Sequence, residues 1–242
     1  MPRNFPITSR IEFRGDANEG PNVRGDFDPE RKCVEYLFTE LALDTTNLYT
    51  QNLDTTSTIA LASGGLLFTT AATDNKVATQ SFGGIWWYAA KNPTVEMRFQ
   101  VNDITNIAIF AGFSDAVTEA AATMPFALAT ATLTDTCTDG VGFLFDTDQT
   151  LDYFNIVNTK NGTQAFSQLA STFVPVNATD LVLRVGLDSA AKATFWWNGV
   201  ACGIKSAAVT AATPLIPFFG IKNMSASAHT ATLKYVRIWQ DM

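Results

Sequence analysis

The segment Thr94–Val101 reads TVEMRFQV and has the clearest pattern in the chain. Its apolar and polar residues alternate strictly and so fall on opposite faces: Val95, Met97, Phe99 and Val101 on one, Thr94, Glu96, Arg98 and Gln100 on the other. A period of two is typical of a β-strand with one buried face. We therefore predict a strand over residues 94–101 whose apolar side chains point into the space between two sheets.

Other segments also indicate strands. IAIFAGF (107–113) is apolar on both faces, which favours a central strand. Shorter patterns predict strands at VGFLFD (141–146), LDYFNIV (151–157), LVLRVGL (181–187) and ATLKYVRIW (231–239). Asn198-Gly199 is the strongest hairpin signal, because both residues tolerate positive φ. Val141, Phe143 and Phe145 are expected to share the interior with the apolar residues of 94–101.

Helical periodicity is scarce. Residues 28–41 (DPERKCVEYLFTEL) are compatible with one short helix, or with a strand through CVEYLF. Roughly ten or more short strands separated by Gly, Asn and Asp turns indicate an all-β, two-sheet antiparallel sandwich over residues 51–242. The first fifty residues hold four of the nine prolines and lack alternation. They predict an extended N-terminal arm over residues 1–50, with at most that one short helix.

Composition and charge argue against several classes of protein. The net charge is −7 with a sequence pI of about 4.6, and no basic cluster occurs, so nucleic-acid binding is not expected. No apolar run is long enough for a membrane span. The N-terminus lacks an apolar h-region, from which we expect no signal peptide. The three cysteines are far apart and odd in number, which favours reduced thiols in a protein made in a cytoplasm.

A family resemblance rests on longer segments, which read VEMRFQVNDITNIAIFAGFSD, DGVGFLFDTD, LVLRVGLDSAAKATFWWNGV, PLIPFFGIKN and ATLKYVRIWQD. They resemble the concanavalin A-like, or laminin G-like, jelly-roll sandwich, in versions found in structural proteins of tailed bacteriophages. The resemblance covers the chain from about residue 58 onward. It implies a two-sheet jelly roll, and it is weak for function, because this fold hosts many activities.

Many relatives with this fold are glycoside hydrolases, which need two carboxylates placed across a sugar. On one strand these acids form an alternating ExDxE pattern, and no such run occurs in this sequence. The polar face of residues 94–101 offers one Glu and an Arg instead. We therefore predict that the chain is not an enzyme and has no catalytic residues.

The sequence also predicts no metal and no cofactor. Several acids lie close together and could serve a hard cation or a solvated turn: Asp135, Asp139, Asp146, Asp148 and Asp152. The segment lacks the Gly and closing Glu of a calcium loop, which favours the turn. The sole histidine, His229, is interpreted as a loop residue before the last strand.

Two aromatic pairs are candidate binding residues, Trp86-Trp87 and Trp196-Trp197. Adjacent residues in a strand point to opposite faces, so one Trp of each pair should be core and the other outward. An outward Trp is either a sugar-stacking platform or an interface anchor. We favour the interface.

The tripeptide RGD occurs twice before the predicted sandwich, in residues 14–16 and 24–26. Each copy places Gly in a tight turn and leaves one cation and one anion projecting, which are Arg14 and Asp16 in the first copy and Arg24 and Asp26 in the second. We hypothesise that these charges pair with complementary groups on a protein shell. The arm would then bind a capsid.

Together these features favour a bacteriophage virion structural protein. The expected role is a decoration or cement protein on the capsid surface, a homotrimer bound to the major capsid protein. The alternative is a glycan- or receptor-binding, lectin-like module of a phage tail or fibre. A degraded glycanase is a third class.

Overall fold

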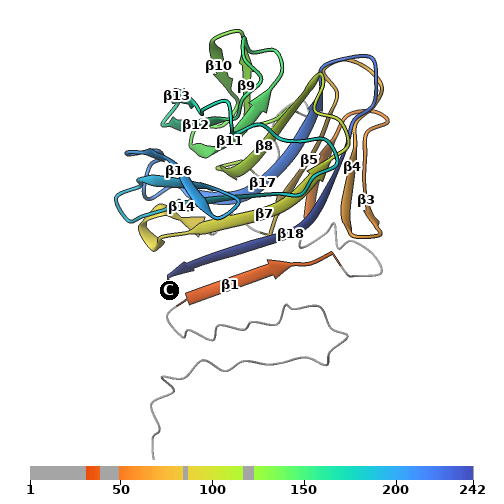
Figure 1. The fold of residues 1–242 in the computed structure, drawn as a ribbon. Helices are drawn as coiled ribbons and strands as arrows, with labels where there is room; N and C mark the ends of the chain where they lie inside the picture. Colours follow the sequence, from red (N-terminus) through yellow and green to blue (C-terminus); the bar gives the residue numbers. More distant parts are fainter. Residues whose placement is uncertain (1–30, 39–48, 84–86, 117–122, 242) are drawn as a thin grey trace, which may run out of the picture.

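The computed structural model describes residues 31–38, 49–83, 87–116 and 123–241. These residues form two large sheets packed face to face and one small hairpin, with a single 3₁₀ turn at Ala89–Lys91 and no α-helix (Figure 1). The predicted all-β, two-sheet antiparallel sandwich is therefore confirmed. In the described residues no helix is long and apolar enough to cross a membrane.

The first sheet, called sheet A, has the strand order β16-β15-β14-β7-β18-β4-β3, and β1 also pairs with β18. Its strands are β1 (Arg31–Tyr36), β3 (Thr58–Ala62), β4 (Gly65–Thr69), β7 (Thr94–Val101), β14 (Leu181–Leu187), β15 (Ala193–Trp197), β16 (Val200–Lys205) and β18 (Thr230–Asp241). Asn198 and Gly199 have φ of 46° and 83° between β15 and β16. The hairpin predicted at this dipeptide is confirmed.

The second sheet, called sheet B, has the order β13-β12-β11-β8-β17-β5-β2, and β6 also pairs with β17. Its strands are β2 (Tyr49–Leu53), β5 (Val77–Phe82), β6 (Trp87–Tyr88), β8 (Ile107–Ser114), β11 (Gly140–Asp146), β12 (Asn155–Lys160), β13 (Thr163–Gln168) and β17 (Pro214–Asn223). The pairings within both sheets are antiparallel.

The interior between the sheets is built from alternate residues. The apolar residues of β7, together with Val141, Phe143 and Phe145 of β11, are buried in one hydrophobic cluster, as predicted. The ring of Phe219 lies 5.0 Å from that of Phe99 and 4.9 Å from that of Phe68, so it joins the two sheets. The strict alternation of residues 94–101 therefore reports a strand with one face in this core.

The outer face of sheet B is covered by a second hydrophobic cluster. A hairpin of β9 (Phe126–Ala129) and β10 (Thr132–Asp135) supplies Phe126, Leu128 and Leu133 to it. Two glycines of β11 make room, because a Cβ at Gly142 would meet the Phe110 ring at 2.6 Å and one at Gly140 would meet the Phe126 ring at 3.2 Å. This explains why β8 and β11 are apolar on both faces.

The sequence-based interpretation of a solvated acidic turn is wrong for two of its residues. Asp146 is 1% exposed, and its carboxylate accepts hydrogen bonds from the backbone N–H groups of Leu128 (2.9 Å) and Asp148 (3.1 Å). Asp139 is 3% exposed and accepts from the Thr210 N–H and the Thr213 hydroxyl. Both acids therefore tie loops and the β9–β10 hairpin to sheet B.

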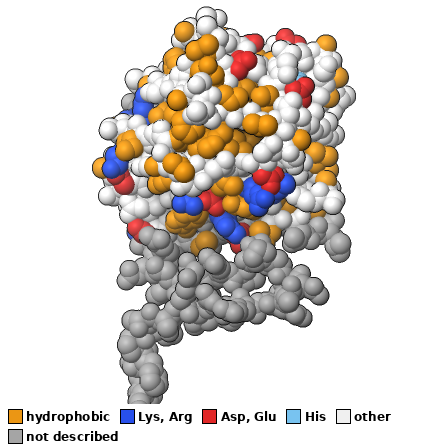
Figure 2. All heavy atoms as spheres, viewed as in Figure 1, with side chains coloured by type: hydrophobic (Ala, Val, Ile, Leu, Met, Phe, Trp, Pro, Cys, Tyr) orange, Lys and Arg blue, Asp and Glu red, His pale blue; other side chains and the backbone are white. Residues whose placement is uncertain are grey.

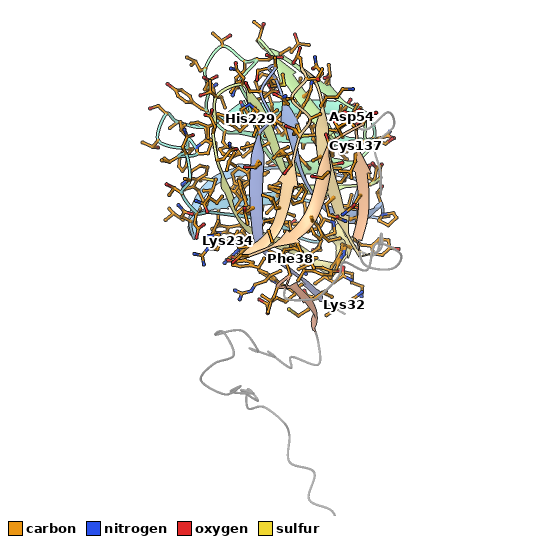
Figure 3. All side chains as sticks on the ribbon, turned by 90° about the vertical axis from the view of Figure 1, so that its right-hand side faces the viewer. Lys32, Phe38, Asp54, Cys137, His229 and Lys234 are labelled. Atoms are coloured by element: carbon orange, nitrogen blue, oxygen red, sulfur yellow. The ribbon has the colours of Figure 1, made fainter. Side chains whose placement is uncertain are left out.

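Two predicted boundaries need correction. The strand predicted over residues 151–157 begins only at Asn155, because the backbone before it is held by loop bonds, such as that from the Phe154 N–H to the Phe173 carbonyl. The arm predicted over residues 1–50 overlaps the sandwich, because β1 pairs with β18 and Phe38 is buried in the core (Figure 3). The strand alternative through CVEYLF (33–38) is therefore correct for residues 33–36, and the observed strand starts earlier, at Arg31. Residues 1–30, with both RGD copies, lie outside the described residues.

A one-residue bulge sets the phase of β18. Leu233 pairs with Phe99 of β7 and Tyr235 pairs with Arg98, so Lys234 is the additional residue. Leu233 faces the core before the bulge, and Val236 and Ile238 face it afterwards. Tyr235, Arg237 and Trp239 consequently lie on the outer face of sheet A.

Gly65 makes room for this bulge. Its φ is +149°, and a Cβ there would overlap the Leu233 carbonyl and approach the Lys234 Cα to 3.1 Å. The neighbouring Gly64 also has positive φ, at +94°, but a Cβ there would meet nothing within 4 Å. A side chain at Gly64 would therefore meet only backbone strain, whereas a side chain at Gly65 would also overlap its neighbours.

We predict that Gly65→Ala lowers the free energy of unfolding by about 1–3 kcal/mol more than Gly64→Ala, because only the first overlaps packed backbone. Denaturant unfolding of both variants measures the difference. Equal destabilisation would show that the bulge does not need the glycine.

Burial raises the pKa of Asp146 to about 6. A raised pKa favours the protonated state in the folded protein, so this contribution to stability is complete below the ordinary pKa of 3.8 and is lost as pH rises through about 6. Between about pH 4 and pH 7 the free energy of unfolding of the wild-type protein should fall by roughly 2–3 kcal/mol more than that of the Asp146→Asn variant. Denaturant titrations of both proteins across this range test it. A difference between them that does not vary with pH would contradict the prediction.

Candidate functional site

The outer face of sheet A carries a row of paired residues that crosses its strands. Trp196 of β15 lies opposite Arg184 of β14, which lies opposite Glu96 of β7. Glu96 in turn lies opposite Arg237 of β18, which lies opposite Glu35 of β1. Cations and anions therefore alternate across neighbouring strands, an arrangement that stabilises cross-strand pairs. We call its four charged residues, Arg184, Glu96, Arg237 and Glu35, the charged row.

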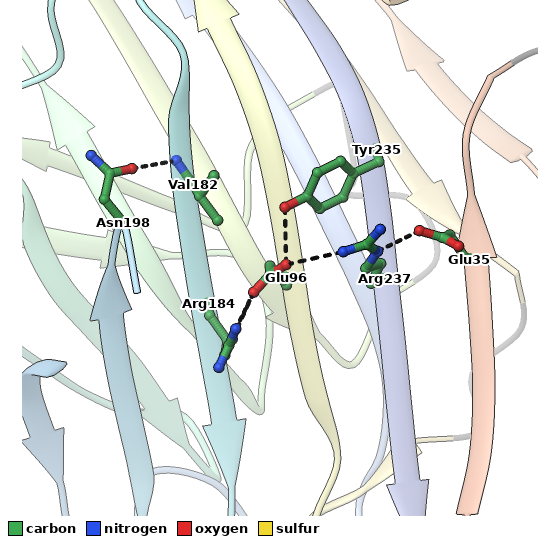
Figure 4. A network of polar contacts seen from close by, with 7 residues as sticks. All are labelled: Glu35, Glu96, Val182, Arg184, Asn198, Tyr235 and Arg237. Atoms are coloured by element: carbon green, nitrogen blue, oxygen red, sulfur yellow. Dashed lines mark hydrogen bonds and ion pairs between the residues drawn. The ribbon is translucent and has the colours of Figure 1, made fainter. Parts of the chain in front are cut away.

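Glu96 is the centre of the charged row (Figure 4). It is 6% exposed, and its carboxylate accepts hydrogen bonds from the Tyr235 hydroxyl (2.9 Å) and from Nε of Arg184 (2.8 Å). Nη1 of Arg237 lies 3.9 Å from the same carboxylate. Because burying a carboxylate is costly unless it is paired and hydrogen-bonded, these partners offset the cost of placing Glu96 in the middle of the sheet.

The partners of Glu96 are affected in turn. Burial, together with the negative charge of Glu96, raises the pKa of Tyr235 to about 12. Tyr235 therefore remains a hydrogen-bond donor at any physiological pH. Arg237 also donates to the carboxylate of Glu35, which links β1 to the row.

A second ion cluster lies beside the charged row. The Asp180 carboxylate, just before β14, pairs with Arg98 of β7 and with Nζ of Lys234, the latter at 2.6 Å. Burial opposes ionisation of Asp180, but the hydrogen bonds from Lys234 and Arg98 outweigh it, and the pKa of this carboxyl lies below its ordinary value. In Figure 2, Lys and Arg side chains lie next to Asp and Glu side chains in the lower half of the described surface.

Two half-buried Trp side chains lie close to the guanidinium of Arg184. Its guanidinium carbon lies 5.7 Å from the ring centroid of Trp196 and 5.7 Å from that of Trp239. Gly186 provides the space for the first ring, because a Cβ there would meet Trp196 ring carbons at 3.1 and 3.3 Å. Two aromatic rings and one cation thus come together on the outer face of sheet A.

This face combines the two kinds of group that polar ring-shaped ligands need. Aromatic faces stack on apolar parts of a ligand ring, and fixed charged and hydroxyl groups hydrogen-bond its polar substituents. Such groups are more effective when their rotamers are already held, as the ion pairs hold Arg184 and Arg98. The outer face of sheet A is therefore the candidate binding site.

The predicted Trp residues occupy different environments. Trp197 packs inward, with its ring 5.2 Å from Phe154 and 5.7 Å from Phe173, whereas Trp196 lies on the outer face. Their opposite orientation follows the expected strand alternation. Trp87 is buried at 2% exposure, so it cannot serve as an exposed anchor. Trp86 lies outside the described residues, as do Arg14, Asp16, Arg24 and Asp26. Partner binding by the predicted residues stays a prediction.

Sequence reasoning missed Arg184, Trp239 and the role of Glu96. Arg184 interrupts an otherwise apolar strand, which is a signal for an outward position. Trp239 reads from the sequence as continuing the alternation of Ala231 and Leu233, and only the bulge at Lys234 reverses its orientation.

The remaining candidate groups do not assemble into a metal site. Within the described ranges, no group of three or more His, Cys, Asp and Glu side chains could hold a metal ion. His229 lies in the loop before β18, as interpreted from the sequence, and is 3% exposed. It lies toward the opposite end of the sandwich from Lys32 (Figure 3).

Comparison with known proteins shows the fold. No protein-family model and no curated protein matches the chain. Among solved structures, the carbohydrate recognition domain of Emp47p is similar over 90% of this chain and 100% of its own, with 11% identity and a TM-score of 0.59. The laminarinase catalytic domain from Thermotoga maritima MSB8 is similar over 88% and 99%, with 8% identity and a TM-score of 0.61. Peanut lectin is similar over 87% and 97%, with 13% identity and a TM-score of 0.55.

The comparison corrects one prediction. The sequence was interpreted as that of a protein that is not an enzyme, but the fold is shared with the catalytic domain of a laminarinase. The shared fold therefore does not exclude a glycoside hydrolase. At these identities the likeness shows the fold alone, and the chain has the concanavalin A-like, lectin-like jelly-roll sandwich.

Proposed function

We propose that the chain is a carbohydrate-binding module whose ligand lies on the outer face of sheet A. The observation that carries the proposal is the placement of the Trp196 and Trp239 rings, each 5.7 Å from the guanidinium carbon of Arg184. Both rings are half-exposed, and the charged row beside them supplies hydrogen-bonding groups. The similarity to a carbohydrate recognition domain and to peanut lectin supports the same class of ligand.

The two outer faces of the sandwich differ in a way that favours this site. The β9–β10 hairpin and its apolar cluster occupy the outer face of sheet B. On sheet A, the half-exposed side chains of Trp196, Tyr235 and Trp239 lie among charged groups. A sugar ring needs an accessible aromatic surface, which sheet A offers among the described residues.

We predict that Trp196→Ala weakens glycan binding at least about tenfold, since a central aromatic contact contributes on the order of 1–2 kcal/mol. A glycan array identifies binders, and calorimetry then measures the dissociation constants. Phe166→Ala is the matched control, because Phe166 is an exposed aromatic residue on β13 of sheet B.

Two outcomes would contradict the proposal. One is glycan binding that survives Trp196→Ala and Trp239→Ala but is lost in the control. The other is the absence of any binder on the array. Reducing ends are measured in the same samples, and their release would assign the chain to the glycoside hydrolases.

The virion context remains a prediction that rests on the sequence resemblance. It includes the decoration or cement role, the homotrimer and contact with the major capsid protein. The lectin-like module of a tail or fibre, raised as the alternative, agrees better with the proposed glycan binding. Copurification with intact particles, or only with tails, tests the location.

A further inference from the structure

The outer face of sheet A is richer in cations than the chain as a whole. Its two ion clusters hold four cationic residues, Arg98, Arg184, Lys234 and Arg237, against three acidic residues, Glu35, Glu96 and Asp180. The whole chain has a net charge of −7. A negatively charged ligand is therefore repelled by the protein in general and attracted, relative to that background, to this face.

The arginines keep hydrogen-bonding capacity for a ligand. Nε and Nη2 of Arg184 both donate to the same oxygen, Oε2 of Glu96. Nε and Nη2 of Arg98 likewise share Oδ2 of Asp180. A guanidinium has five N–H donors, and in the described part of the chain no hydrogen bond occupies the Nη1 side of either arginine. The Arg184 and Arg98 side chains are 36% and 45% exposed.

Arg184 is held in place before any ligand arrives. Glu96 fixes one edge of its guanidinium, and the rings of Trp196 and Trp239 lie at equal distances from its carbon. A planar guanidinium with a free edge matches the geometry of a carboxylate or sulfate. A sugar that carries such a group can pair with Arg184 while its ring lies against an adjacent Trp.

The second cluster repeats this chemistry one row away. Arg98 is two residues from Glu96 along β7, a separation of about 7 Å at the rise of a β-strand. Lys234, which shares the Asp180 carboxylate with Arg98, supplies a further cation at the bulge of β18. Cationic points on successive rows suit a chain of sugars with repeated acidic groups.

From these contacts we propose that the ligand is an anionic glycan, with a carboxylate or sulfate paired to Arg184 and a sugar ring stacked on Trp196 or Trp239. This inference rests on the proposed carbohydrate binding and adds the chemical class of the sugar. Carboxylate and sulfate share the recognition chemistry, and the experiment separates them.

The test compares each acidic oligosaccharide with a neutralised form of the same sugar chain. Calorimetry measures binding of an oligogalacturonate and its methyl ester, and of a heparin oligosaccharide and its desulfated, carboxyl-reduced form. We expect at least one acidic form to bind tenfold or more tightly than its neutral form. That preference should weaken with added salt.

Variants of Arg184 test whether this residue causes the preference for acidic over neutral glycans. Arg184→Lys keeps a positive charge beside Glu96 but lacks the planar fork, and Arg184→Gln removes the charge. We expect the acid preference to fall about tenfold in Arg184→Gln and by less in Arg184→Lys. Lys160→Gln, at the exposed end of β12, removes one charge elsewhere and should leave the preference unchanged. Thermal unfolding confirms that each variant is folded.

The outcomes separate this inference from the proposed function. Equal binding of acidic and neutral forms, lost in Trp196→Ala, would overturn the anionic ligand and keep carbohydrate binding. An acid preference that persists in Arg184→Gln would overturn the assigned site. Equally tight binding of polyglutamate would show attraction to charge alone and would overturn both, as would the lack of any glycan binder.

Discussion

The contact of Phe219 with Phe99 and Phe68 is the constraint on which the rest of the structure depends. These rings can contact one another only if β4 and β7 of sheet A and β17 of sheet B all point them into the space between the sheets. A slip of one residue in β4 or β7 would turn its buried set outward, and in β17 it would exchange Phe219 of the interior cluster with Phe218 of the cluster on the outer face of sheet B. Because Phe99 is fixed in the core, Glu96 and Arg98 of the same strand are fixed on the outer face. Core packing thus determines where the polar groups of sheet A stand.

Because packing of Phe99 fixes the position of Glu96, the outer face of sheet A must offset the cost of burying the Glu96 carboxylate. Glu96 lies in the middle of a sheet, where few waters reach its carboxylate, so its charge needs partners from neighbouring strands. Arg184 comes from one side of β7, and Arg237 and Tyr235 come from the other. Glu35 extends the row to β1. The same pairs that neutralise one carboxylate hold two arginines and a tyrosine in defined positions, and this order is what a binding surface requires.

Much of the fold could be predicted from the sequence, and the reasons are local. The alternation of residues 94–101 and the Asn198-Gly199 turn report directly on backbone geometry within a few residues. The start of β12 could not be predicted, because the Phe154 N–H before it donates to the carbonyl of Phe173, which is distant in the sequence. The charged segment that forms β1 was assigned to an arm, because its pairing with β18, which places Glu35 opposite Arg237, joins residues far apart in the sequence. Arg184 and Glu96 are 88 positions apart, and no spacing rule connects them.

The bulge at Lys234 has a consequence for how such a surface can change during evolution. Loss of the Lys234 codon would place Tyr235 directly after Leu233, so Val236 and Ile238 would still face the core and Tyr235, Arg237 and Trp239 would still face outward. A lineage that lost this residue would keep the aromatic and charged groups of β18 and would lose only the cation that Lys234 provides to Asp180. Insertion or loss of a single residue between Val236 and Ile238 would instead turn the residues on one side of it to the other face of the sheet.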